Sequence, residues 1–147
     1  MSGNNLKLVS CNQRRYWDFV LTLRNDLREG FVSQEHIAEE DHYRFMEKYS
    51  DHYYICLEGE TPVGWVGNID QDIRVATHPD HQKKGVGRFL INELMIRHPD
   101  AFAKVKLDNE ASLRLFESCG FKKKYYLLER WRMLVFDENK ERDDFWL

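Results

Sequence analysis

Residues 73–87 read IRVATHPDHQKKGVG, and this stretch decides the fold. Asp72 to Thr77 carries branched and small apolar residues and is predicted to form a strand. His78-Pro79 ends that strand, because proline has no N–H group for a strand ladder. A helix is then predicted to begin near Gly85, so the two glycines of the stretch lie between a strand and a helix.

The turn at 82–88, QKKGVGR, has features of a diphosphate-binding turn. Free backbone N–H groups and the positive end of the helix dipole attract phosphate, and glycines let the backbone come close. The turn is not a P-loop, because residue 80 is not glycine and the Gly-Lys-Ser/Thr ending is missing. It is not a dinucleotide fingerprint either, because Leu90 stands at the third glycine position. On its own, the turn is as typical of a helix start with solvated lysines as it is of a diphosphate site.

The composition is that of one globular domain. The chain has 147 residues, of which 42% are hydrophobic and 14% aromatic, enough for one sizeable core. Charged residues make up 32%, yet the net charge is only −3 and both signs are interspersed, which argues against nucleic acid and acidic membranes as partners. No stretch approaches the roughly 18 apolar residues of a membrane span, and we expect a cytoplasmic protein.

The same periodicity reasoning predicts an alternation of strands and helices along the chain. Further strands are predicted at 6–10, 53–57, 62–69 and 105–107, and one or two final strands within 121–136. Helices are predicted at 16–23, 33–49, 86–98 and 109–120. This order indicates a mixed α/β (α+β) architecture.

Cysteine and histidine spacing predicts no disulfide and no metal site. Cys11, Cys56 and Cys119 are odd in number and far apart, so we expect reduced, mostly buried thiols. His78 and His81 have ligand-like spacing, but no further ligands stand at a recognisable distance in the sequence.

Two segments together resemble one known family. Residues 73–87 closely resemble motif A of the GNAT superfamily of N-acetyltransferases, and residues 109–121, NEASLRLFESCGF, resemble its motif B. The resemblance implies a GNAT-like fold, with a central mixed, mostly antiparallel sheet flanked by about four helices. Element order extends it to a single domain at 1–136, followed by a charged tail at 137–147.

The resemblance implies acetyl-CoA as the acyl donor. Backbone groups of Val75, Ala76 and Thr77 would pair with the pantetheine arm, and an N–H there, assigned to Thr77, would polarise the thioester carbonyl. Asn109 would hydrogen-bond the pantetheine, with Ser112 beside it and Phe116 near the thioester. The residues expected to wrap the pyrophosphate are Gln82, Lys83, Lys84, Gly85, Val86, Gly87 and Arg88.

In such enzymes an acceptor amine attacks the thioester directly, so the leaving thiolate benefits from a proton donor. The family commonly has a tyrosine seven residues after the motif B asparagine, and Phe116 stands there in this sequence. Phe116 cannot donate a proton, and it equally suits helix packing. Tyr125, Tyr126, Cys119 or water would then supply the proton, or catalysis would be weakened.

Asp72 is the candidate general base, because many relatives carry a glutamate at about this place. It would equally suit a solvated turn. His78 is a second candidate by its near-neutral pKa, although a loop histidine is more often a surface residue.

The acceptor site in this superfamily is shaped by the first two helices and their loop, here 24–49. We expect Arg24, Phe31 and Tyr43 to contact the acceptor. Acidic residues at 39–41 would attract a cationic amine, whereas Arg24 and Arg28 would suit a phosphate or carboxylate.

The leading hypothesis is an acetyl-CoA-dependent N-acetyltransferase acting on a primary amine of a small metabolite, an amino sugar, a peptide or a protein. The alternative is an acyl-CoA-binding module of the same fold with little or no turnover. An apolar chain end, Phe145-Trp146-Leu147, together with Trp131 predicts a homodimer.

Overall fold

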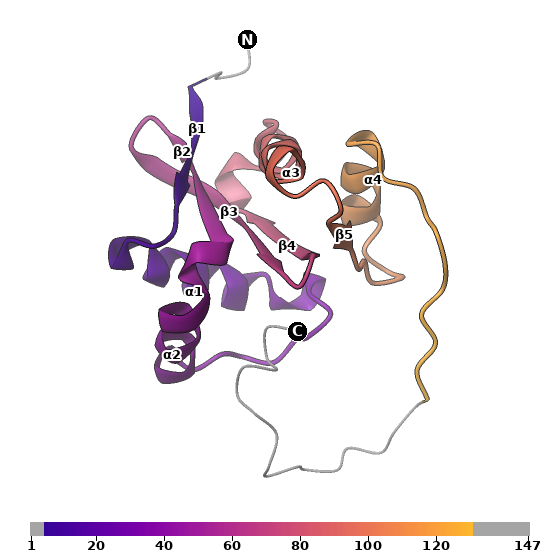
Figure 1. Ribbon diagram of the computed structural model, residues 1–147, viewed down its shortest axis with the longest axis horizontal. Coiled ribbons are helices and arrows are strands. Elements are labelled where there is room, and N and C mark those ends of the chain that lie inside the picture. The colour runs from indigo at the N-terminus through magenta and orange to yellow at the C-terminus, as the bar shows by residue number, and fades with distance from the viewer. Residues whose placement is uncertain (1–4, 131–147) are drawn as a thin grey trace.

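A five-stranded sheet forms the centre of the computed structural model, which describes residues 5–130 (Figure 1). The strands lie side by side in chain order: β1 (Leu6–Ser10), β2 (Tyr53–Glu58), β3 (Thr61–Ile69), β4 (Asp72–Thr77) and β5 (Phe102–Ala103). The first four pair antiparallel and β4 pairs parallel with β5. The mixed, mostly antiparallel sheet is therefore confirmed.

In the described part of the chain, four α-helices cover the sheet, two on each face (Figure 1). The helices are α1 (Trp17–Asp26), α2 (Glu39–Tyr49), α3 (Val86–Arg97) and α4 (Glu110–Ser118). Buried residues of α1 and α2 form one core cluster with Tyr53, Ile55 and Trp65 of the sheet. Those of α3 and α4 form the other with Cys56 and Val66. Neighbouring residues of β2 thus point to opposite faces, as the period of two requires.

One-turn 3₁₀ helices connect several of these elements. They span Arg14–Tyr16, Arg28–Gly30, Ser50–His52 and Pro79–His81. The last one lies between β4 and the turn of interest, and the His78 ring at its start accepts a hydrogen bond from Asp80 N at 3.1 Å.

The second helix begins later than the sequence indicates, at Glu39 and not near Ser33. Residue 37 is held outside the helix by Asn25 of α1, which accepts from Ile37 N at 2.9 Å and donates to Ile37 O at 3.0 Å. This contact joins residues twelve positions apart, so local periodicity does not reveal it.

Two strand predictions are corrected. β5 lies at Phe102–Ala103 and not at 105–107, and Leu107 is exposed. Residues 121–130 form no strand, and residues 131–136 lie outside the described part of the chain. Strand propensity depends on a partner, and β5 offers a pairing segment of only two residues. The domain end at 136 and the tail at 137–147 stay predictions.

The cysteines form no disulfide among themselves. Cys11 and Cys56 are buried, and burial raises the pKa of each thiol to about 12, so both are protonated and unreactive at neutral pH. Cys119 is partly exposed. Within residues 5–130, no group of three or more potential ligands could hold a metal ion. No helix in the same range has the length and apolarity to cross a bilayer.

Candidate functional site

The sheet opens at β4, on the edge that faces β5. β5 pairs only with Asp72 and Ile73, while β3 pairs with β4 up to Thr77. The edge of β4 from Arg74 to Thr77 therefore has no strand partner on this side among residues 5–130. Backbone N–H and C=O groups at such an edge need partners, and an extended ligand can supply them.

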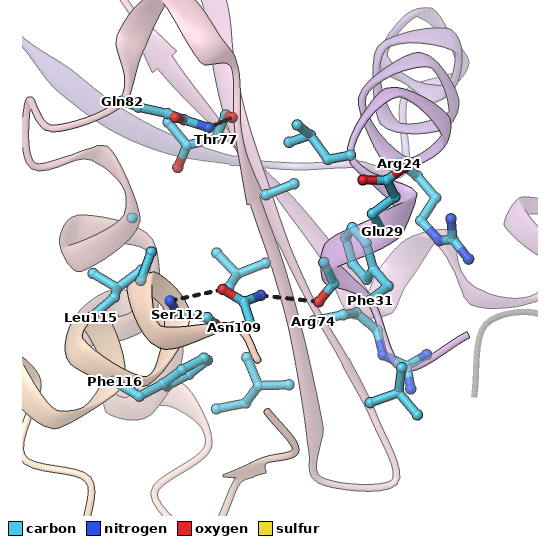
Figure 2. Close-up of a pocket in the computed structure, with 18 of the residues that line it drawn as sticks. Arg24, Glu29, Phe31, Arg74, Thr77, Gln82, Asn109, Ser112, Leu115 and Phe116 are labelled. Atoms are coloured by element: carbon cyan, nitrogen blue, oxygen red, sulfur yellow. Dashed lines mark hydrogen bonds between the residues drawn. The ribbon is translucent and has the colours of Figure 1, made fainter. Parts of the chain in front are cut away.

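A cavity of about 730 Å³ lies along this open edge. Its walls come from β4, from the turn before α3, from α4 and from the loop after α1. In Figure 2, Arg24, Phe31 and Arg74 lie on one side, while Asn109, Ser112, Leu115 and Phe116 lie on the other. A volume of this size accommodates a large organic ligand.

The turn before α3 is built to expose its backbone N–H groups. Gly85 has a φ of 88°, a left-handed conformation that glycine adopts without cost, and Lys83 has a φ of 63°. No side chain caps the N-terminus of α3. The first-turn N–H groups, together with Lys83 and Arg88 at the cavity wall, therefore have the arrangement of a helix start that can accept an anion.

Glycine at 87 permits close approach between α3 and α4. A Cβ atom there would lie 2.9 Å from Leu115 Cδ2 and 3.6 Å from Thr77 Oγ1. At the same end of the cavity, the Gln82 side chain donates to Thr77 O at 3.4 Å and joins the turn to the end of β4 (Figure 2).

Asn109 joins α4 to the loop after α1. Its Oδ1 accepts from Ser112 N at 3.1 Å and caps the helix, and its Nδ2 donates to Gly30 O at 3.2 Å (Figure 2). Lys106 makes a parallel link, with its Nζ donating to Glu29 O at 2.8 Å. These two hydrogen bonds connect both sides of the cavity.

Phe116 lines the cavity and also packs inside the domain. It is 5% exposed, and its ring lies edge-on to Phe121 with the ring centroids 5.1 Å apart. The wall at this point is apolar.

Most of the predicted site residues line this one cavity. Those in its wall are Arg24, Phe31, Asp72, Val75, Ala76, Thr77, Gln82, Lys83, Gly85, Gly87, Arg88, Asn109, Ser112 and Phe116. Val86, the first residue of α3, is buried in the core. The Lys84 side chain is exposed and does not line the cavity. Tyr43 also lies elsewhere, because its hydroxyl donates to Asp18 of α1, which raises the pKa of Tyr43 to about 12.

Sequence reasoning missed Arg74, which lines the cavity from the middle of β4. Its Nη2 lies 3.5 Å from Asp72 Oδ2, and Lys104 Nζ lies 3.4 Å from the same oxygen. A charged residue within the apolar run IRVA of a buried strand was the available signal.

The Acetyltransferase (GNAT) family profile matches residues 17–121, from the start of α1 to just beyond α4. The chain belongs to the GNAT acetyltransferase family. The match includes both segments on which the resemblance rested, and it spans all the elements that line the cavity.

One curated relative is the N-alpha-acetyltransferase RimI of Mycobacterium tuberculosis, 30% identical over 84 residues. The match covers 50% of this chain and 53% of the relative, so the chain spans about half the length of the curated protein it matches.

Solved structures share this GNAT fold. A spermidine N-acetyltransferase chimera of Vibrio cholerae SpeG and hSSAT gives a TM-score of 0.71 at 20% identity, covering 89% of both chains. The putative acetyltransferase yncA of Salmonella typhimurium, solved with its cofactor acetyl-CoA, gives 0.66 at 19% identity, covering 81% of this chain and 80% of the other. At these identities the likeness concerns the fold.

Proposed function

We propose that this GNAT domain transfers an acetyl group from acetyl-CoA to a primary amine, by direct attack of the amine within a ternary complex. The observation that carries the proposal is the open edge of β4, which runs into the glycine turn within one cavity. An extended arm ending in a diphosphate has this shape and charge pattern. The yncA structure, with acetyl-CoA bound, supports the choice of donor.

The residues of the cavity fit such a donor. The N-terminus of α3 would hold the pyrophosphate, with Lys83 and Arg88 adding charge-assisted hydrogen bonds. The β4 backbone from Val75 to Thr77 would pair with the pantetheine arm, and Asn109 and Ser112 would lie along it. Acetyl-CoA supplies an activated thioester; the protein orients it and excludes water.

Two groups on β4 are assigned to the chemistry. The N–H of Thr77, near the end of the open edge, would stabilise negative charge on the thioester oxygen. Asp72 would take the proton of the attacking amine. Because Asp72 is five residues from Thr77, or about 17 Å along a strand, we assign the transfer to a chain of several waters.

A direct assay tests the proposal. The purified chain is incubated with acetyl-CoA and a broad panel of amines, while free CoA thiol and acetylated product are measured. Product formed in step with CoA release is the expected result. Tight acetyl-CoA binding without product from any amine would favour the acyl-CoA-binding module, and absence of binding would overturn both readings.

Replacing Phe116 with tyrosine is expected to change kcat by less than about threefold. A CoA thiolate, like a cysteine with a pKa of about 8.5, leaves readily near neutral pH, so water suffices as the proton source. Steady-state kinetics against the native chain check this expectation.

Phe121→Tyr is the matched control, because Phe121 contacts Phe116 but does not line the cavity. A rise in kcat of tenfold or more in Phe116→Tyr alone would show that the native site lacks an acid that it needs.

A homodimer and a cytoplasmic location stay predictions. The residues that suggested the dimer, Trp131 and 145–147, lie outside the described part of the chain.

A further inference from the structure

Two buried guanidinium groups stand on the side of the cavity opposite α4. Arg24 comes from α1 and is 1% exposed, and Arg74 comes from β4 and is 7% exposed. Both line the cavity (Figure 2). Removing an arginine charge from water is costly, so the partners of each buried guanidinium need an account.

Arg74 has hydrogen-bonding capacity to spare. Its Nη2 is 3.5 Å from Asp72 Oδ2, which makes an ion pair but not a short hydrogen bond. Its Nη1 is buried and makes no hydrogen bond of good geometry to any residue within 5–130, although Arg74 interacts with the buried Tyr53 hydroxyl. The carboxylate of Asp72 is also shared with Lys104 at 3.4 Å, so one acid faces two cations. An anion in the cavity would supply the missing acceptor.

Arg24 adds a second positive charge to the same region. Its Nη2 donates to Ser33 O, and its guanidinium lies 4.8 Å from the centre of the Phe31 ring. Burial lowers the pKa of Arg24 to about 10; Arg28 and Arg74 lower it further, while Tyr53 and Glu35 oppose the fall. Arg24 therefore remains charged at neutral pH and adds to the positive potential on this side of the cavity.

The acidic residues that line the cavity are either exposed or already paired. Asp26 and Glu29 line it but are exposed, so water and salt screen their charges. Asp72 is already engaged by Arg74 and Lys104. Lys83 and Arg88 lie at the turn assigned to the pyrophosphate. Among these charged groups, the Arg74 guanidinium is the one that is buried on the side of the cavity opposite α4 and still has an unused donor.

We propose that the acceptor amine carries an acidic group, a carboxylate or a phosphate, which Arg74 binds. The inference rests on the proposed acetyltransferase function and narrows its acceptor class. Amines whose other substituents are neutral or cationic, polyamines included, leave the buried Arg74 donor without an acceptor and are disfavoured. Arg74 is suited to the task because its planar fork of donors matches both acid groups.

Matched pairs of amines test this substrate class. One pair is an amino acid and its carboxamide, and the other is an aminoalkyl phosphate and the corresponding amino alcohol. A linear diamine serves as the cationic probe. We expect the acidic member of at least one pair to have a kcat/KM at least tenfold higher, and the pair that shows the preference identifies the acid group.

Arg74→Gln is expected to lower the ratio of kcat/KM for the preferred acidic acceptor to kcat/KM for its neutral partner about tenfold, mainly through the KM of the acidic acceptor. The ratio is the quantity compared, because Arg74 also pairs with Asp72 and its loss affects the turnover of both acceptors. Arg74→Lys should restore part of the preference. Arg44→Gln is the control, because Arg44 is exposed on α2 and pairs with Asp41 away from the cavity. A preference that persists unchanged in Arg74→Gln would overturn the assignment of Arg74.

Calorimetric titration of acetyl-CoA separates this inference from the proposed function. If the native chain binds acetyl-CoA and acetylates the carboxamide, the amino alcohol or the diamine as well as the acids, the inference fails and the function stands. If the native chain binds no acetyl-CoA, both fail. Inhibition of the native enzyme by an amine-free carboxylate or phosphate tests the anion site without any variant. If neither compound inhibits, the result counts against the anion site.

Discussion

Replacing Gly85 with glutamate is expected to weaken acetyl-CoA binding by about a hundredfold or more. Gly85 has a φ of 88°, and a Cβ atom there would meet no heavy atom within 4 Å. The new side chain therefore enters open space and brings a carboxylate to the helix start assigned to the pyrophosphate. Left-handed backbone costs a non-glycine residue about 1 kcal/mol, and repulsion between the two anions adds to this cost. Calorimetric titration of acetyl-CoA measures the change.

Two further variants separate charge from backbone strain. Gly85→Gln has the same strain and nearly the same volume without the charge, so binding should weaken by about tenfold at most. Gly120→Glu carries equal charge and comparable strain, because Gly120 has a φ of 91° and open space around it, but it follows α4 and lies outside the cavity lining. It should bind acetyl-CoA as the native chain does. Native-like affinity in Gly85→Glu would show that this turn does not hold the cofactor.

The segment from β4 to α3 could be predicted from the sequence because its signals are local. The strand at Asp72–Thr77 and the helix start at Val86 lie where the proline and glycine residues indicate. Asn109 as the cap of α4 is equally local, since its side chain bonds a backbone group three residues on. These three features form the part of the cavity that we assign to acetyl-CoA.

The part of the cavity that we assign to the acceptor, around Arg24, Phe31 and Arg74, depends on contacts between distant residues. The sequence predicts it less completely. Arg24 and Phe31 line the cavity, but Tyr43 is turned away because Asp18, twenty-five positions earlier, accepts its hydroxyl hydrogen. The start of α2 is set by Asn25 in the same manner. Arg74 lines the cavity because its side chain points to the face of the sheet that α1 and α2 cover. The alternation of side chains along a strand predicts that Arg74 and Ala76 share a face, but it does not predict that this face borders a cavity.

The pairing of α1 with α2 is expected to weaken as the pH falls from about 6.5 to about 4. His42 of α2 is fully buried, and its Nε2 lies 2.7 Å from Trp17 O of α1, the distance of an N–H donor to a carbonyl. Burial lowers the pKa of His42 to about 4, against the smaller opposing effects of this hydrogen bond and of Asp18. The unfolded chain, with an ordinary histidine pKa of about 6.5, therefore takes up the proton first.

The difference between the folded and unfolded pKa of His42 makes the protein less stable in acid. The folded state holds His42 neutral, so its contribution to stability is complete above pH 6.5 and is lost progressively as the pH approaches 4. A difference of this size corresponds to about 3 kcal/mol of unfolding free energy. Urea unfolding at several pH values between 7 and 4, followed by tryptophan fluorescence, measures the loss.

The matched variants are His42→Gln and His36→Gln. His42→Gln should lower stability at pH 7 and remove most of the histidine-linked slope, because no proton is then taken up at residue 42. His36 is exposed in the loop before α2, so His36→Gln should keep the native slope. An unchanged slope in His42→Gln would contradict the assignment. α1 carries Arg24 and leads into the loop that holds Phe31. Loss of the His42 contact in acid should therefore loosen this side of the cavity at a higher pH than the glycine turn before α3.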